Sequence, residues 1–106
     1  MTNEKFNAVV QEQLELCERL LIKKGEEYDR GSIDRLHAFK VAAAMQQTSQ
    51  QMALAGMMAK HTTSIYDLIR DGTTDIMLWD EKITDHINYL LLLKAIIIEE
   101  AEHEQN

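Results

Sequence analysis

The sequence predicts an all-α, four-helix bundle-like fold in a single domain spanning residues 1–106. Apolar residues recur at helical spacing in four successive segments. The chain has no proline and only four glycines, so it lacks the frequent turn signals of a β-sandwich or barrel. Its content of 45% hydrophobic and 27% charged residues is typical of a folded globular domain.

The first helix is expected from residue 3 to about residue 28. Its apolar residues share one face of an ideal helical wheel: Phe6, Val9, Val10, Leu14, Cys17, Leu20 and Leu21. If the wheel continues past Gly25, Lys24, Glu27 and Tyr28 also face inward. That extension is conditional, because a glycine costs a helix about 1 kcal/mol.

A turn at residues 29–34 separates this helix from a short second one at about 35–45. Ser32 or Asp34 is a candidate N-cap for the second helix. The residues expected to face inward are Leu36, Phe39 and Ala43, with Val41 as a further candidate.

The third helix is predicted from a capping box, with Thr48 as N-cap and Gln51 three residues later, to about Arg70. Its inward stripe consists of Met58, His61, Ile65 and Leu68. Asp71 and Gly72 form the stop signal.

The fourth helix begins between residues 75 and 78 and continues to about residue 102. The predicted core stripe is Trp79, Ile83, Ile87 and Leu90. The opposite side begins with Glu81, Asp85 and Asn88 and then becomes apolar at Leu92 and Ile96. Because two apolar faces need two partners, we expect the chain to form a homo-oligomer, a dimer or larger, through this C-terminal helix.

The acidic start of the fourth helix is a candidate metal site. Glu81, Asp85 and Asn88 offer five side-chain oxygens on one face, and Mg²⁺ prefers oxygen ligands. The alternative is an ordinary solvated acidic face. The apolar continuation at Leu92 favours the metal site.

Two further groups of residues are candidate ligand contacts. Glu27 could join the metal site and Lys24 could contact a phosphate, or the two could form an intrahelical ion pair. His61, next to Lys60, is either a core histidine with a satisfied partner or a phosphate contact. Cys17 lies within an apolar stripe and is interpreted as packing.

The composition of the chain indicates its cellular location and excludes some classes of partner. The formal net charge of −7 disfavours general nucleic-acid binding, which requires Lys and Arg. A single cysteine cannot form an internal disulfide, which favours a reducing, cytoplasmic location. The late apolar run is about half the roughly 20 residues that a membrane span needs, so no membrane association is expected.

Four segments in order resemble a family of small phage and prophage proteins. They are KGEEYD (24–29), DRLHAFKVAAA (34–44), ALAGMMAKHTTSIYDLI (53–69) and LWDEKITDHINYLLLLKA (78–95). That family is grouped with the nucleotide modification associated domain and with MazG-like all-α nucleoside-triphosphate pyrophosphohydrolases. The strict enzyme pattern, E-x-x-E followed by E-x-x-D on a later helix, is absent, since the later pair Glu81 and Asp85 is E-x-x-x-D.

The resemblance implies a Mg²⁺-dependent nucleotide-binding protein of phage origin, acting in the cytoplasm of a bacterial host. In the pyrophosphohydrolase version of this hypothesis, Glu27, Glu81 and Asp85 hold the metal and serve catalysis. The expected ligand contacts are Lys24, Lys60, His61, Asn88 and Tyr89. The alternatives are a non-catalytic protein that sequesters a nucleotide and an acidic protein that binds and inhibits a host protein.

Overall fold

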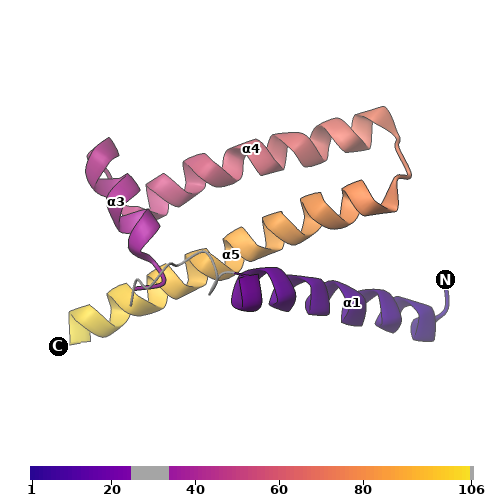
Figure 1. Cartoon of the computed structure of the whole chain (residues 1–106), viewed down its shortest axis with the longest axis horizontal. Coiled ribbons are helices and arrows are strands. Elements are labelled where there is room, and N and C mark those ends of the chain that lie inside the picture. Colours follow the sequence, from indigo (N-terminus) through magenta and orange to yellow (C-terminus); the bar gives the residue numbers. More distant parts are fainter. Residues whose placement is uncertain (25–33, 106) are drawn as a thin grey trace.

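A computed structural model describes residues 1–24 and 34–105, with the side chains of Lys24 and Gln105 outside the description. Within those residues every regular element is helical (Figure 1). The elements are α1 (Asn3–Glu18), the π-helical continuation η1 (Arg19–Lys24), α3 (His37–Gln46), α4 (Gln50–Asp71) and α5 (Ile76–Gln105). The all-α prediction is therefore confirmed.

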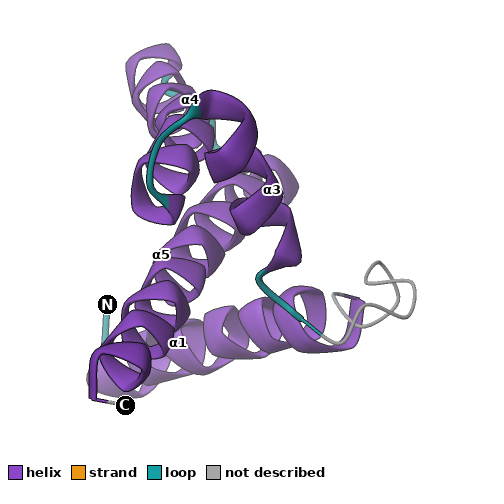
Figure 2. Ribbon diagram, turned by 90° about the vertical axis from the view of Figure 1, so that its left-hand side faces the viewer, coloured by secondary structure: helices purple, strands orange, loops and turns teal. Residues whose placement is uncertain are grey.

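The helices form three layers, with α5 in the middle (Figure 1). α4 and α5 run antiparallel as a hairpin, and α3 packs against the start of α4 (Figure 1). α1 crosses α5 on the side away from α4 (Figure 2). α5 is thus the central helix, covered on one side by α4 and on another by part of α1.

The turns follow local sequence signals with small shifts from the predicted positions. Ser49, not Thr48, caps α4, because its hydroxyl accepts a hydrogen bond from the Met52 backbone N–H at 3.1 Å. Gly72 ends α4 in the left-handed conformation at φ 70°, which glycine adopts without steric cost. The predicted stop signal is confirmed.

The start of the short helix α3 differs from both predicted caps. Asp34 Oδ1 accepts a hydrogen bond from the Leu36 backbone N–H at 3.0 Å, two residues ahead of it, so Asp34 shapes the turn that leads into α3. Leu36 occupies the cap position and makes no side-chain capping bond. The other candidate, Ser32, lies outside the described residues.

The main core joins α3, α4 and α5. Its buried members are Leu36, Phe39, Leu54 and Ile96. Met57, Met58, Tyr89, Leu92 and Leu93 pack against them. The predicted inward residues Leu36, Phe39 and Ala43 are buried as expected, whereas Val41 is exposed.

The faces of α5 follow the prediction only in part, since Trp79 and Ile87 of the predicted core stripe are half-buried. Ile96 is fully buried and Leu92 packs in the same core, so the face predicted to contact another subunit lies inside this chain. Ile83 and Leu90, predicted as core, are 36% and 48% exposed. The prediction failed because both faces are apolar there, and periodicity cannot decide which face meets α4.

The apolar face of α1 is only partly covered. Cys17 is 3% exposed against α5, but Phe6, Val10 and Leu14 on the same wheel face are 41–56% exposed. Beyond Glu18 the π-helical turn rotates less per residue than an α-helix, so a wheel extended to Lys24 no longer predicts its face. Glu27 and Tyr28 lie outside the described residues.

Candidate functional site

Three predicted ligand residues meet between α4 and α5. His61 lies on the half-buried stripe of α4, together with Met58, Ile65 and Leu68, as predicted. Asp85 and Tyr89 are one helical turn apart on α5, so they share a face that looks toward α4. The His61 Nδ1 atom is 3.9 Å from Asp85 Oδ2, and the His61 and Tyr89 ring centroids are 4.8 Å apart with the rings tilted by 43°.

The separation of His61 and Asp85 leaves capacity for a ligand. A distance of 3.9 Å is longer than a hydrogen bond, so this contact does not occupy the carboxylate oxygen with a bonded proton. The side chains of His61 and Asp85 are 25% and 35% exposed, which makes both half-buried and reachable from solvent. The cluster therefore offers a carboxylate, an imidazole and an aromatic ring at one accessible seam.

Asn88 adds an unsatisfied polar atom one turn after Asp85. The residue is 8% exposed, and its Oδ1 has no hydrogen-bond partner among the described residues. A buried amide oxygen without a partner costs about 1–3 kcal/mol. The unpartnered Asn88 oxygen, one helical turn after Asp85, is consistent with a polar ligand or water at this level of α5.

The remaining predicted site residues do not join this cluster. Glu81 and Lys60 are exposed, on α5 and α4 respectively. Glu27 and the side chain of Lys24 lie outside the described residues. Within residues 1–24 and 34–105, no three His, Cys, Asp or Glu side chains are grouped closely enough to hold a metal ion.

A second polar group, missed from the sequence, ties the start of α3 to the end of α5. Lys40 Nζ lies 2.5 Å from Asp34 Oδ2 and 2.8 Å from Glu99 Oε1. The hydrogen bond from Lys40 lowers the pKa of the Asp34 carboxyl below its ordinary 3.8. Hydrogen bonds to Asp34 and Glu99 raise the pKa of Lys40 above its ordinary 10.5. No helical period signals contacts between such distant segments.

A cavity lies elsewhere, between η1, the segment that leads into α3 and the end of α5. It holds about 640 Å³ and is lined mainly by apolar side chains, including Leu21, Leu36 and Ile98. Arg35 lies at this cavity, and its Nη2 donates to the Leu21 carbonyl at 2.7 Å. None of the predicted site residues whose side chains the structure describes lines it, so the cavity and the His61 cluster are separate places.

Comparison with family models, curated proteins and solved structures finds no match to this chain. None of the described helices combines the length and the apolar character needed to span a membrane.

Proposed function

We propose that this chain binds a nucleotide together with Mg²⁺ at the seam between α4 and α5. The observation that carries the proposal is the contact of His61 with Asp85 and Tyr89. Two separate sequence segments, each singled out for nucleotide chemistry, supply these residues. The resemblance to the phage protein family supports the same ligand class.

The donor set is compatible with Mg²⁺. Asp85 has a carboxylate oxygen not held by a hydrogen bond from His61, and Glu81 is one turn earlier on the same helix. Mg²⁺ is commonly held by one or two carboxylates and keeps several waters. When bound, the metal would screen the phosphate charge that this acidic chain otherwise repels.

The other side chains have roles that follow from their chemistry. The Tyr89 and His61 rings provide flat surfaces on which a base can stack. The Asn88 amide can hydrogen-bond a base edge or a coordinated water. Lys60, exposed one residue before His61, and Lys24 can meet phosphate oxygens as point charges.

Turnover would make the protein a nucleoside-triphosphate pyrophosphohydrolase. Water would then attack the α-phosphorus, and pyrophosphate would leave with the electrons of the broken P–O bond. That reaction calls for Glu27 to join Glu81 and Asp85 around the metal. A protein that binds without hydrolysis would sequester the nucleotide, and in either case we place it in the cytoplasm of a phage-infected bacterium.

Calorimetry with the common ribonucleoside and deoxyribonucleoside triphosphates tests the proposal. Binding should require Mg²⁺, and Asp85→Asn should weaken it by about 1–3 kcal/mol, because a charged partner is lost. Asp80→Asn is the matched control, since Asp80 lies on the same helix but is turned away from Asp85 on the helical wheel. It should bind like the original chain.

Two results would overturn the proposal. One is the absence of binding by any of these nucleotides, with Mg²⁺ present and the helical circular dichroism intact. The other is unchanged affinity in Asp85→Asn. Phosphorus NMR of the bound mixture then separates hydrolysis, which releases pyrophosphate, from sequestration, which leaves the triphosphate whole.

A further inference from the structure

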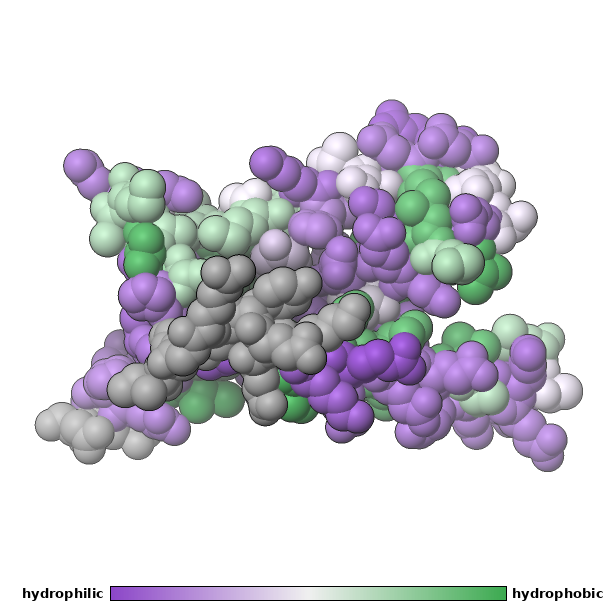
Figure 3. Space-filling view, viewed as in Figure 1, coloured by the Kyte–Doolittle hydropathy of each residue, from purple (hydrophilic) through white to green (hydrophobic). Residues whose placement is uncertain are grey.

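Apolar side chains remain exposed along one side of α1 and along one side of α5. On α5, Ile76, Ile83, Leu90 and Ile97 recur every seventh residue and are 36–66% exposed. On α1, Phe6, Val9, Val10 and Leu14 are 41–56% exposed. We call these the α5 stripe and the α1 stripe. Figure 3 shows hydrophobic surface among the polar atoms of the layer that holds α1 and α5.

The seven-residue spacing on α5 is the pattern of a helix that packs along another helix. A residue every seventh position stays on one side of an α-helix, with a drift of only about 20° per repeat. The stripe lies opposite Leu92 and Ile96, which face the core of the same chain. α5 therefore has one apolar side that packs inside the chain and a second apolar side that is exposed.

The overall dimensions also indicate a missing partner. The chain exposes 8088 Å², whereas a compact monomer of its 12.2 kDa exposes about 6,100 Å². Its radius of gyration is 16.1 Å, and a compact domain of 106 residues has about 13 Å. The excess of roughly 2,000 Å² is within the range of about 1,000–2,500 Å² that each subunit of an obligate dimer buries.

Charge favours pairing of α1 with α5 of a second copy. α1 carries four glutamates and one lysine, and on the wheel these charged residues fall outside the α1 stripe. Lys94 is the charged residue within the run Leu90–Ile98, and it is exposed beside the α5 stripe. Two-fold symmetry would bring the acidic flank of α1 in one copy to Lys94 of the other, twice.

We infer that a second copy of this chain occupies this surface, with the α1 stripe of each copy packed against the α5 stripe of the other. The two α1 and two α5 helices then form a shared four-helix layer, and each α4 lies outside it. Leu90 is an inner residue of the α5 stripe, where burial contributes most to binding. Leu14 is the last residue of the α1 stripe and is 55% exposed. This pairing does not depend on the nucleotide site.

Light scattering and sedimentation at low micromolar concentration test the pairing. The original chain should have twice the mass of 12.2 kDa. Leu90→Glu and Leu14→Glu should each raise the dissociation constant by roughly 100-fold or more, because each places a charge inside the apolar interface. The matched control is Ile69→Glu, an equally apolar residue that is 59% exposed on α4. It should remain dimeric.

Cross-linking keeps the inference testable if a glutamate variant does not fold. Leu14→Cys and Leu90→Cys chains are mixed and treated with a short bis-maleimide, and a mixed covalent dimer is expected. Ile69→Cys mixed with Met45→Cys should give none, and Cys17 is too buried to react. A monomeric original chain, or a dimer that keeps its mass in both glutamate variants and gives no Leu14-to-Leu90 link, would overturn the pairing.

Discussion

Thr84 shows how single polar residues position α1 on α5. It is 1% exposed, and its hydroxyl accepts a hydrogen bond of 2.7 Å from Gln13 Nε2 of α1. The same Gln13 amide approaches Cys17 Sγ at 3.5 Å. A polar pair inside an apolar contact fixes orientation, because other placements of α1 would leave both groups without partners.

Replacement of Thr84 by Val should therefore destabilise the fold although it retains shape and adds apolar surface. The Gln13 amide would lose its oxygen acceptor, and we expect a loss of about 1–3 kcal/mol in the free energy of unfolding. Urea denaturation followed by circular dichroism measures it. Thr63→Val on the exposed face of α4 is the control and should change stability by less than about 0.5 kcal/mol. Equal effects of the two changes would contradict the role given to Thr84.

The residues of the candidate site show what sequence reasoning can reach at this scale. His61 and Asp85 were both singled out, and their contact joins α4 to α5 as a helix hairpin requires. Lys60 is exposed and His61 is half-buried. The polar partnerships of Lys40 with Glu99 and of Gln13 with Thr84 were missed, because neither lies within one helix where spacing is informative.

At the scale of elements, the turn between α4 and α5 followed from local chemistry, whereas the buried face of α5 did not. The stop at Gly72 and the start of α5 near Asp75 depend on a few neighbouring residues, so the sequence predicts them. The exposure of the Leu90 side chain depends on which side of α5 is covered by α4. That placement is set by the packing of the whole chain. A helix with two apolar faces gives no local signal of which face α4 covers.

The link between α3 and α5 makes the stability of the chain depend on pH. Because the folded pKa of Asp34 is lowered, its contribution is present above pH 3.8 and is lost as the pH falls through the folded pKa. Because the folded pKa of Lys40 is raised, its contribution is present below pH 10.5 and is lost as the pH rises through the folded value.

Lys40→Met tests this linkage, since it keeps most of the side-chain stem and removes the charge. The urea midpoint of the variant should be lower than that of the original chain at neutral pH. The difference should narrow as the pH falls below 3.8 toward the lowered folded pKa of Asp34, through which the folded carboxyl takes up its proton. Lys60→Met, at an exposed position of α4, is the control and should show no such pH-dependent difference. A constant difference from pH 7 to pH 3 would contradict the linkage.

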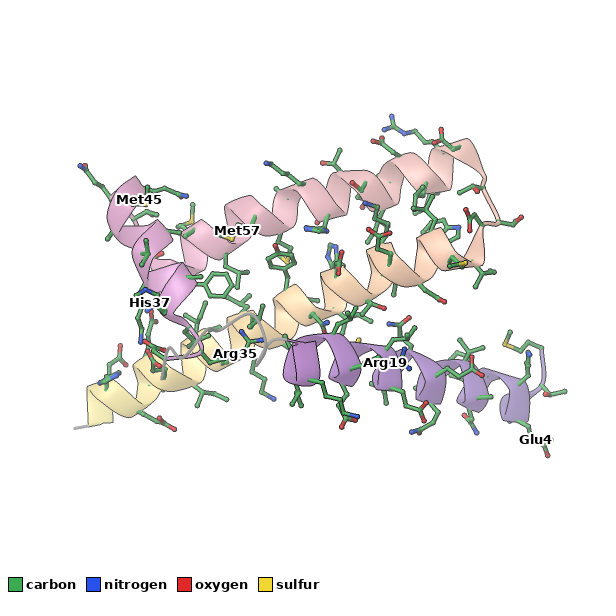
Figure 4. All side chains as sticks on the ribbon, viewed as in Figure 1. Glu4, Arg19, Arg35, His37, Met45 and Met57 are labelled. Carbon is green, nitrogen blue, oxygen red and sulfur yellow. The ribbon has the colours of Figure 1, made fainter. Side chains whose placement is uncertain are left out.

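At the scale of the molecule, the chain combines a small core with long helices. Four buried side chains from α3, α4 and α5 form the centre of the core, while half of α1 and the outer side of α5 remain exposed. Figure 4 shows side chains that project from α1 and α5 without a neighbouring helix of the same chain. The stability of such a chain should come partly from its own core and partly from its second copy.

Ile96 and Ile97 separate these two contributions, because they are adjacent and identical but point about 100° apart around the helix, one into the core and one to the surface. Ile96 is 0% exposed and Ile97 is 51% exposed. Ile96→Ala should lower the free energy of unfolding by about 2–5 kcal/mol, since it opens a cavity in the core. Ile97→Ala should act on the pairing instead.

A protein stabilised by association has a melting temperature that rises with its concentration. The melting temperature of the original chain should rise with protein concentration between about 1 and 100 µM. Ile96→Ala should lower the melting temperature equally at all concentrations. Ile97→Ala should make the melting temperature depend less on concentration. Scanning calorimetry across that range measures all three. A melting temperature of the original chain that does not change with concentration would contradict the pairing, whereas equal downward shifts in both variants would contradict the assignment of the two faces of α5.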